Sequence, residues 1–393
     1  MVTSLKIAAF LLALGFLQAS RTQPSTYKWQ LPPGFPQPRV PADNPMSDAK
    51  VELGHYLFYD KRLSFNQKQS CATCHQQSRA FTDGRARAVG STGEVHPRSS
   101  MSLVNVAYLP ALTWANPSLT QLEAQALVPM FGDRPVELGM KGREDLLLAR
   151  IKKVPEYQRL FPAAFPGEQD PFTVTHLVQA LSSFERTILS GDSPYDRYFR
   201  GTDPDAISAS ARRGAEHFLS EKFQCFHCHA GLNFANAEDF IGKKSPELEF
   251  DNTGLYNVQG NTSYPVPNTG LFEYTRRRTD IGKFRVPTLR NIDVTSPYMH
   301  DGSVRTLDEV LDHYGDGGRT ILSGANAGVG AANSNKSIFL PGFNATPEER
   351  RDIIEFLKSL TDASVRSPSA AQPICPFLKY PRGRQQRHVL RAE

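Results

Sequence analysis

Apolar residues recur at helical spacing in several separate stretches of the chain. In the clearest stretch, 171–189, the apolar positions fall on one helix face: Phe172, Leu177, Val178, Leu181, Phe184 and Ile188. Similar spacing predicts helices over 49–57, 119–127, 143–151, 209–219 and 347–360. Thr346 suits the N-cap of the last helix, and Glu348 and Glu349 suit its first turn. Turn-forming residues fill the segments between, so we expect a mainly α fold with long loops.

The composition is that of a globular protein. Hydrophobic residues make up 39% of the chain and charged residues 22%, and a length of 393 residues suffices for two or three domains. Lysine and arginine number 45 against 40 for aspartate and glutamate, and no dense basic run precedes the C-terminal tail. The charge therefore gives no case for nucleic-acid binding.

Residues 1–20 have the composition of a signal peptide. Lys6 is followed by an apolar run of about 11 residues, which is short for a membrane span. Ala19 and Ser20 place cleavage near 19–20, although Leu17 fits poorly at a position that usually holds a small residue. An uncleaved N-terminal anchor is the alternative. No other segment is apolar enough to span a bilayer, so we expect an exported protein whose mature chain has no membrane span.

Four of the five cysteines lie in two C-x-x-C-H frames. The frames are Cys71-Ala-Thr-Cys74-His75 and Cys225-Phe-His-Cys228-His229, which start 154 residues apart. In such a frame both thiols bond to the vinyl groups of a haem, and the histidine becomes an iron ligand. One helical turn brings both thiols to one porphyrin edge, and the next residue then places its imidazole under the iron. The frames predict two covalently bound haem c groups, with His75 and His229 as proximal ligands.

Two other uses of paired cysteines fit these frames less well. A zinc site would bring two C-x-x-C units within roughly 15–20 residues of each other. A thioredoxin-like dithiol would need neither the histidines nor a second copy. His227 lies inside the second frame, and we interpret it as a spacer. The fifth cysteine, Cys375, falls in a Pro-rich tail.

The order of helix and frame occurs twice along the chain. The stretch "RRGAEHFLSEKFQC" before the second frame echoes "AKVELGHYLFYDKR…SC" before the first. We therefore expect an internal duplication of cytochrome c-like units. The predicted N-terminal haem domain spans 28–200 and the C-terminal one 201–365. The tail, 366–393, has the composition of a disordered segment.

Several motifs together resemble the bacterial diheme cytochrome c peroxidase/MauG superfamily. They are "CATCH", "LTWANPSL", "RPVELG", "CFHCH", "FRVPTLRNI", "SPYMHDGS" and "TLDEVLDHY". The resemblance covers about 28–362. Within the superfamily, "STGEVHPRSSMSLVNVAYLPALTWANP" is most similar to the MbnH subgroup, the methanobactin-associated diheme enzymes. The resemblance implies two haem domains, of which the first reacts with peroxide and the second transfers electrons.

The resemblance also implies the second ligand of the C-terminal haem. Typical diheme peroxidases have a methionine there, whereas Tyr314 stands at the equivalent position of this chain, as in MauG-type enzymes. Thr306 and Glu309 form a capping box, so Tyr314 should lie near the end of a helix that starts at Thr306. A phenolate oxygen stabilises oxidised iron, whereas a thioether favours reduced iron. His313 or Met299 is the alternative ligand.

The N-terminal haem is implied to be the peroxide site. Glu137, in "RPVELG", matches the family acid/base that moves a proton between the peroxide oxygens. Gln125 matches a residue that hydrogen-bonds bound oxygen species, and Pro129 matches one that shapes the pocket. Typical peroxidases block this iron with a mobile histidine, for which His96 is the nearby candidate. We assign His96 a structural or pocket-edge role and expect an open first haem.

Two further sites follow from the resemblance. Trp114, one of two tryptophans, matches the family residue that lies between the haems and relays charge; packing in the core is its alternative role. The carbonyls of Thr295 and Pro297 match two ligands of a structural Ca²⁺. Ser99 replaces the family's asparagine ligand, and this weakens the calcium hypothesis because a hydroxyl is a poorer ligand than an amide oxygen.

The function implied is that of a periplasmic MauG-type enzyme. It uses H2O2 to form a high-valent state, similar to bis-Fe(IV), that oxidises a residue on a partner protein. For the MbnH subgroup the residue is a tryptophan converted to kynurenine on a copper-binding, MbnP-like partner. One alternative is a diheme peroxidase that reduces H2O2 to water with electrons from a small cytochrome c or cupredoxin, which Tyr314 argues against. The other is a diheme electron carrier, in which Glu137 and Gln125 would have no purpose.

Overall fold

The computed structural model describes residues 27–246 and 248–366. The predicted signal peptide and nearly all of the predicted tail lie outside the described residues. The α-helices are α1 Asp48–Tyr59, α2 Cys71–Cys74, α3 Leu122–Phe131, α4 Glu144–Lys152, α5 Pro155–Ala164, α6 Val174–Glu185, α7 Pro194–Phe199, α8 Ala209–Phe218, α9 Phe272–Thr275, α10 Leu307–Gly315, α11 Pro347–Ser359 and α12 Ala363–Arg366. Two short antiparallel pairs join β1 Phe250–Asp251 to β2 Phe284–Arg285, and β3 Thr320–Ile321 to β4 Gly328–Val329. The predicted mainly α class is confirmed. In the described ranges no helix has the length and apolar character needed to cross a bilayer.

The caps predicted for the last two long helices are present. Thr306 begins α10 and Thr346 begins α11, and each forms a capping box with the glutamate three residues later. The helix expected over 171–189 is shorter, because Thr173 caps α6 and the helix ends at Glu185. α5 and α7 were not predicted. Each has a proline in its first turn, where the missing N–H costs nothing, although proline otherwise indicates a break.

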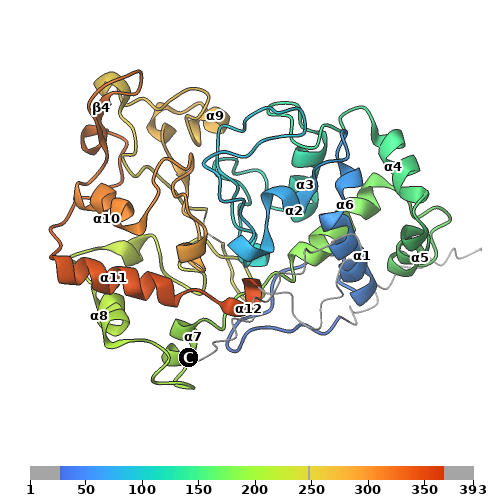
Figure 1. Ribbon diagram of the computed structural model, residues 1–393, viewed down its shortest axis with the longest axis horizontal. Helices are drawn as coiled ribbons and strands as arrows, with labels where there is room; N and C mark the ends of the chain where they lie inside the picture. The colour runs from blue at the N-terminus through green and yellow to red at the C-terminus, as the bar shows by residue number, and fades with distance from the viewer. Residues whose placement is uncertain (1–26, 247, 367–393) are drawn as a thin grey trace, which may run out of the picture.

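Two crossed helix pairs have the same internal contact. In one half of the molecule α1 crosses α6, and in the other α8 crosses α11 (Figure 1). A Cβ on Gly54 of α1 would lie 1.9 Å from the carbonyl oxygen of Ala180, and a Cβ on Gly214 of α8 would lie 1.8 Å from that of Asp352. Only glycine allows the two backbones to approach so closely. The echo seen in the sequence therefore has a structural counterpart.

Each helix pair belongs to its own apolar cluster. The first cluster gathers residues of α1 to α6, and the second gathers residues of α8, α10 and α11 with the loops between them. Some residues cross between the halves: Val365 of α12 joins the first cluster, for example, and Ala115 joins the second. The domain boundary near 200 stays a prediction, because each cluster contains residues from both sides of that position.

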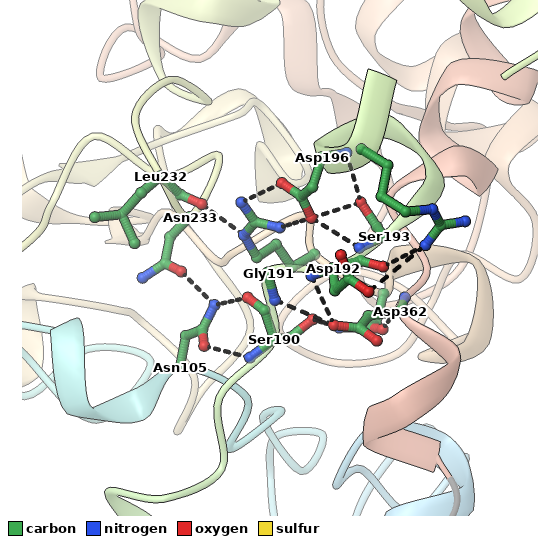
Figure 2. Close-up of polar contacts among 12 residues, drawn as sticks. Asn105, Ser190, Gly191, Asp192, Ser193, Asp196, Leu232, Asn233 and Asp362 are labelled. Carbon is green, nitrogen blue, oxygen red and sulfur yellow. Dashed lines mark hydrogen bonds and ion pairs between the residues drawn. The ribbon is translucent and has the colours of Figure 1, made fainter. Parts of the chain in front are cut away.

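Buried asparagines connect the two halves. Asn105 donates from Nδ2 to the carbonyl of Ser190 at 2.8 Å and to Oδ1 of Asn233 at 2.9 Å (Figure 2). Its own Oδ1 accepts the N–H of Ser190 at 2.8 Å. Asn291 makes a similar contact, because its Oδ1 accepts the N–H of Asp362 at 2.8 Å. Both asparagines have a positive φ, of 57° and 62°, a conformation that asparagine tolerates better than most residues.

A buried ion pair lies beside these asparagines. Arg290 donates from Nη1 and Nη2 to the two carboxylate oxygens of Asp196, at 2.8 and 3.0 Å. Asp196 also accepts the N–H and hydroxyl of Ser193, which starts α7 (Figure 2). Because a buried carboxylate without its partner is costly, this pair specifies how α7 meets the motif that contains Arg290.

Candidate active site

The two C-x-x-C-H frames adopt nearly the same backbone turn. The first forms α2, and the second forms a 3-10 turn over Cys225–His227. In each, the N–H of the histidine donates to the carbonyl of the first cysteine, at 2.9 Å for both His75 and His229. Both thiols of a frame therefore lie on one turn, immediately before the histidine.

Both histidines are oriented by the same second contact. Nδ1 of His75 lies 2.9 Å from the carbonyl oxygen of Phe81, and Nδ1 of His229 lies 2.9 Å from that of Phe234. These bonds assign the proton to Nδ1 and the lone pair to Nε2, the arrangement that supports a metal-ligating histidine. The two phenylalanines have φ values of 61° and 50°, which is uncommon for an aromatic residue. A strained conformation that occurs twice, each time supplying the carbonyl to a frame histidine, indicates function.

A large, mostly apolar cavity surrounds the second frame. Its wall includes Cys225, Cys228 and His229 together with Tyr314, and about 1860 Å³ is free of protein atoms, part of it open to solvent. Met299 also lines this cavity. His313 is buried on the same helix, but it is not among the described residues that line the wall. The geometry thus places Tyr314 and Met299, rather than His313, within the same space as His229.

The hydroxyl of Tyr314 is neutral in the folded protein. Burial, then the nearby Cys228, Cys225 and Asp251, raise the pKa of Tyr314 above its ordinary value. The phenol therefore keeps its proton unless a metal ion displaces it. α10 ends at Gly315, one residue beyond Tyr314, as its capping box predicted.

A buried arginine also faces the cavity. The Arg285 side chain donates to the carbonyls of Thr113 and Val286 and to Sδ of Met101. Among the described residues no carboxylate pairs with it. Burial lowers the pKa of Arg285 to about 10, so the group stays charged at neutral pH. A buried cation without a counter-ion, lining a cavity, is suited to hold an anion such as a haem propionate.

Glu137 lies near the first frame. Burial raises the pKa of its carboxyl to about 7, although the side chain keeps 31% of its exposure. After burial, the charge of Glu137 is among the groups that raise the thiol pKa values of Cys71 and Cys74, which indicates proximity. Nε2 of His96 is 3.9 Å from Oε1 of Glu137. This contact of His96 with Glu137 was not foreseen from the sequence, and the structural or pocket-edge role of His96 stays a prediction.

Backbone contacts hold the Glu137 loop against α3. The carbonyl of Pro129 accepts the N–H of Leu138 at 2.8 Å, and Met130 accepts that of Met140 at 2.9 Å. Gln125 lies one helical turn before Pro129 and is half-buried. α3 and its following loop thus bring Gln125 and Glu137 onto adjoining segments.

Trp114 lies where the two halves meet. Its Nε1 donates to the carbonyl of Ser99 at 2.9 Å, and its carbonyl accepts the N–H of Arg285 at 2.8 Å. The residue lines the cavity that contains His229 and packs against the second cluster. Ser99, Thr295 and Pro297, expected near calcium, line the same cavity. The Ser99 hydroxyl donates to the carbonyl of Met299 at 3.2 Å.

Known proteins with similar sequences decide the family. The family model described as di-haem cytochrome c peroxidase matches residues 48–204. The methylamine utilization protein MauG of Methylorubrum extorquens is 34% identical over 335 residues, which cover 85% of this chain and 83% of that protein. The chain belongs to the diheme cytochrome c peroxidase family.

Two other known proteins are similar to this diheme peroxidase. The cytochrome-c peroxidase IdrP1 of Denitromonas iodatirespirans is 35% identical over 351 residues, covering 84% of this chain and 87% of that protein. The crystal structure of a MauG-like protein associated with microbial copper homeostasis has a TM-score of 0.86 and 44% identity, covering 90% of this chain and all of that chain. The diheme peroxidase is thus a haem-dependent oxidoreductase with two haem c groups, which is more than a carrier of electrons.

The residues present fit both haem groups. Each frame supplies two thiols on one turn and a histidine with an oriented Nε2, and the second frame opens into an apolar cavity that contains an unpaired arginine. Arg285 was missed at the sequence level, although it lies within "FRVPTLRNI". Its burial results from contacts with Thr113 and Met101, which are distant in the chain, so no local pattern reveals it.

Proposed function

We propose that this diheme peroxidase uses hydrogen peroxide at the first frame to oxidise a residue on a partner protein, with the second frame storing part of the oxidising power. The observation that carries the proposal is Tyr314 on the cavity wall with His229, because a phenolate ligand favours oxidised iron. Glu137, with a pKa of about 7, supports peroxide chemistry at the first frame.

Haem, bound through Cys71, Cys74 and His75 and through the matching second set, supplies redox-active iron at each frame. The chain holds and tunes these groups. The carbonyls of Phe81 and Phe234 fix the two histidines through Nδ1. Arg285 offers its buried charge to the propionates of the second haem.

Glu137 handles the protons of peroxide. With a pKa of about 7, its carboxylate accepts a proton from one peroxide oxygen, and its carboxylic acid returns it to the other. The side chain keeps 31% of its exposure, so small molecules can reach it. Gln125 orients the oxygen species from the adjoining helix.

Trp114 carries electrons between the two frames. Its indole is oxidisable, and its hydrogen bond to Ser99 and backbone bond to Arg285 fix its place between the halves. Ca²⁺ at the carbonyls of Thr295 and Pro297 would hold the same junction.

The substrate we propose is a copper-binding protein outside the cytoplasm, with a tryptophan as the oxidised residue. Support comes from 44% identity to a MauG-like protein associated with microbial copper homeostasis. The apolar run at 7–17 supports export to the periplasm.

The test supplies fully oxidised diheme protein and H2O2 to a purified periplasmic copper-binding protein, without any electron donor. We expect peptide mass spectrometry to find a tryptophan oxidised to kynurenine, and E137Q to abolish the change. A partner that stays unmodified while a reduced small cytochrome c is rapidly oxidised would contradict the proposal.

Rapid oxidation of the small cytochrome c would instead identify an ordinary diheme peroxidase. One observation favours this second candidate function. Met299 lines the same cavity as His229, and a thioether ligand would suit a haem that accepts electrons from a small donor protein. Replacing Met299 by Leu would then remove the low-spin signature of the second haem, whereas replacing Tyr314 by Phe would leave it.

A further inference from the structure

A row of aromatic rings runs from Trp114 along the cavity wall to Tyr256. The His300 ring is 6.4 Å from the Trp114 ring and 6.2 Å from that of Tyr264, between centroids. Tyr264 in turn lies 5.5 Å from Tyr256. Trp114, His300 and Tyr264 line the cavity of the second frame, whereas Tyr256 is not among its lining residues. Because each gap is a single ring contact, an electron can pass along the row in short steps.

The two tyrosines differ in the group that receives their proton. The Tyr264 hydroxyl donates to the amide oxygen of Asn252 at 2.7 Å. The Tyr256 hydroxyl donates to the carboxylate oxygen Oδ2 of Asp301 at 2.6 Å. An oxidised phenol is a very strong acid, so a tyrosine is oxidised most easily where a base already accepts its hydrogen bond. An amide oxygen is a poor base, whereas a carboxylate is a good one.

Asp301 is ionised at neutral pH. Burial alone would raise its pKa, but the neighbouring His300 and the hydrogen bonds from Tyr256 and Ser303 hold the carboxyl pKa below its usual value. The other charged group facing Tyr256 is Arg319, whose guanidinium lies 4.6 Å above the ring centre. Asp301 is therefore a base in place beside Tyr256.

The pair lies just beneath the surface. Tyr256 is 7% exposed. The exposed Ser303 donates its N–H to Oδ1 of Asp301 at 3.1 Å, and Arg319 donates from Nη1 to the Ser303 hydroxyl at 2.8 Å. Hydrogen bonds thus connect Tyr256 through Asp301 to the exposed Ser303, and Arg319 lies over the Tyr256 ring.

We propose that Tyr256 is a redox-active tyrosine that carries an oxidising equivalent from the cavity to the surface around Ser303. Tyr256 gives one electron to the peroxide-oxidised centre through Tyr264 and Trp114. Its O–H bond breaks, and the proton forms a new O–H bond on Asp301. H2O2 takes up two electrons from the peroxide-reacting centre and two protons from solvent, and leaves as two waters. Tyr256 returns one of these electrons to the oxidised centre, and a second transfer from the partner's residue returns the other.

This inference rests on the proposed function, since the oxidant is H2O2 acting at the first frame. It also assigns a location to the reaction with the partner protein, which would be oxidised at the surface around Ser303, next to Tyr256. Re-reduction of Tyr256 by the partner's residue returns the proton from Asp301, so the pair is reset after each transfer.

The test is freeze-quench electron paramagnetic resonance of the diheme protein mixed with H2O2, with peroxide consumption followed optically. We expect a tyrosyl signal that narrows when the tyrosines are ring-deuterated. Y256F should remove it, and D301N should lower its yield by about tenfold or more, because a charge-assisted hydrogen bond is lost. Y274F is the matched control, since Tyr274 is an exposed tyrosine outside the row, and it should leave the signal unchanged. Y264F should slow formation of the signal, because Tyr264 lies in the row, but it should leave the shape of the signal unchanged.

Each other outcome is decisive. Peroxide consumption without a tyrosyl signal in the wild type overturns the inference and leaves the proposed function standing. A signal that survives in Y256F and disappears in Y264F places the radical on Tyr264 and also overturns it. If the oxidised protein consumes no peroxide at all, the proposed function fails and the inference fails with it. Deuterated wild-type protein gives an answer even if Y256F does not fold.

Discussion

The indole Nε1 of Trp114 donates a hydrogen bond to the carbonyl oxygen of Ser99 at 2.9 Å. The bond ties the ring to the segment that also reaches His300, because the N–H of Ser99 donates to the His300 carbonyl at 2.9 Å. Trp114 is thereby held at the junction of the two halves, where we propose that it relays electrons.

Replacing Trp114 by Phe should slow oxidation of the partner protein by about tenfold or more, equivalent to ~1.4 kcal/mol of barrier. Both haems should stay attached, because none of their attachment residues changes. Partner oxidation by mass spectrometry measures the effect. The control is W29F, since Trp29 is the other tryptophan and packs edge-on against Tyr27. Equal rates in W114F and W29F would remove Trp114 from the pathway.

Replacing Tyr314 by Met should raise the reduction potential of the second haem by on the order of 0.1 V or more, because a thioether favours reduced iron. Spectroelectrochemical titration measures the shift. Tyr298 also lines the cavity, so Y298F is a control that should leave the potential nearly unchanged. An unchanged potential in Y314M would mean that Tyr314 is not a ligand.

The reaction of the oxidised enzyme with peroxide should accelerate between about pH 6 and 8. Burial raises the Glu137 pKa to about 7, so the carboxyl is protonated below that pH and becomes a base above it. E137Q should lose the pH dependence and react roughly 10²- to 10⁴-fold more slowly. Stopped-flow rates test this. E94Q is the control, because Glu94 accepts only the Val136 N–H in this loop and should keep the profile. The same rise with pH in E137Q would assign the titration to another group.

Replacing Gly214 by Ala should destabilise the protein by about 1–3 kcal/mol or more. The new Cβ would meet the carbonyl oxygen of Asp352 at 1.8 Å, so α8 and α11 must separate. The free energy of unfolding in denaturant measures the loss. E216A, an exposed change on the same helix, should stay within about 0.5 kcal/mol of the wild type. A neutral G214A would mean that the helix contact is looser than described.

Local sequence patterns predicted the parts of this fold that depend on local forces. Thr306 and Thr346 cap their helices as expected, because a capping box is formed by residues three apart. The first helix of each pair was predicted, and the glycine in the repeated stretch proved to be the crossing point. The prolines of α5 and α7 misled the prediction, since a proline breaks a helix interior but favours a first turn.

The site was predicted unevenly for the same reason. The two C-x-x-C-H frames predict haem attachment from the sequence alone, because their cysteines and histidine lie next to one another in the chain. The positions of Tyr314, Trp114 and Glu137 came from the family resemblance, and their roles stay predictions. Three features could not be predicted, because they depend on chain segments that meet only after folding. They are the buried charge of Arg285, the contact of His96 with Glu137 and the hydrogen bond from Tyr256 to Asp301.

The central claim is that both frames share the oxidising power of peroxide. The most direct measurement is a visible and near-infrared spectrum of the purified, fully oxidised protein after addition of one equivalent of H2O2. The account predicts an immediate, long-lived species with a near-infrared charge-resonance band, and W114F should weaken that band. A protein that does not react until one haem has been reduced would contradict the account and identify an ordinary peroxidase.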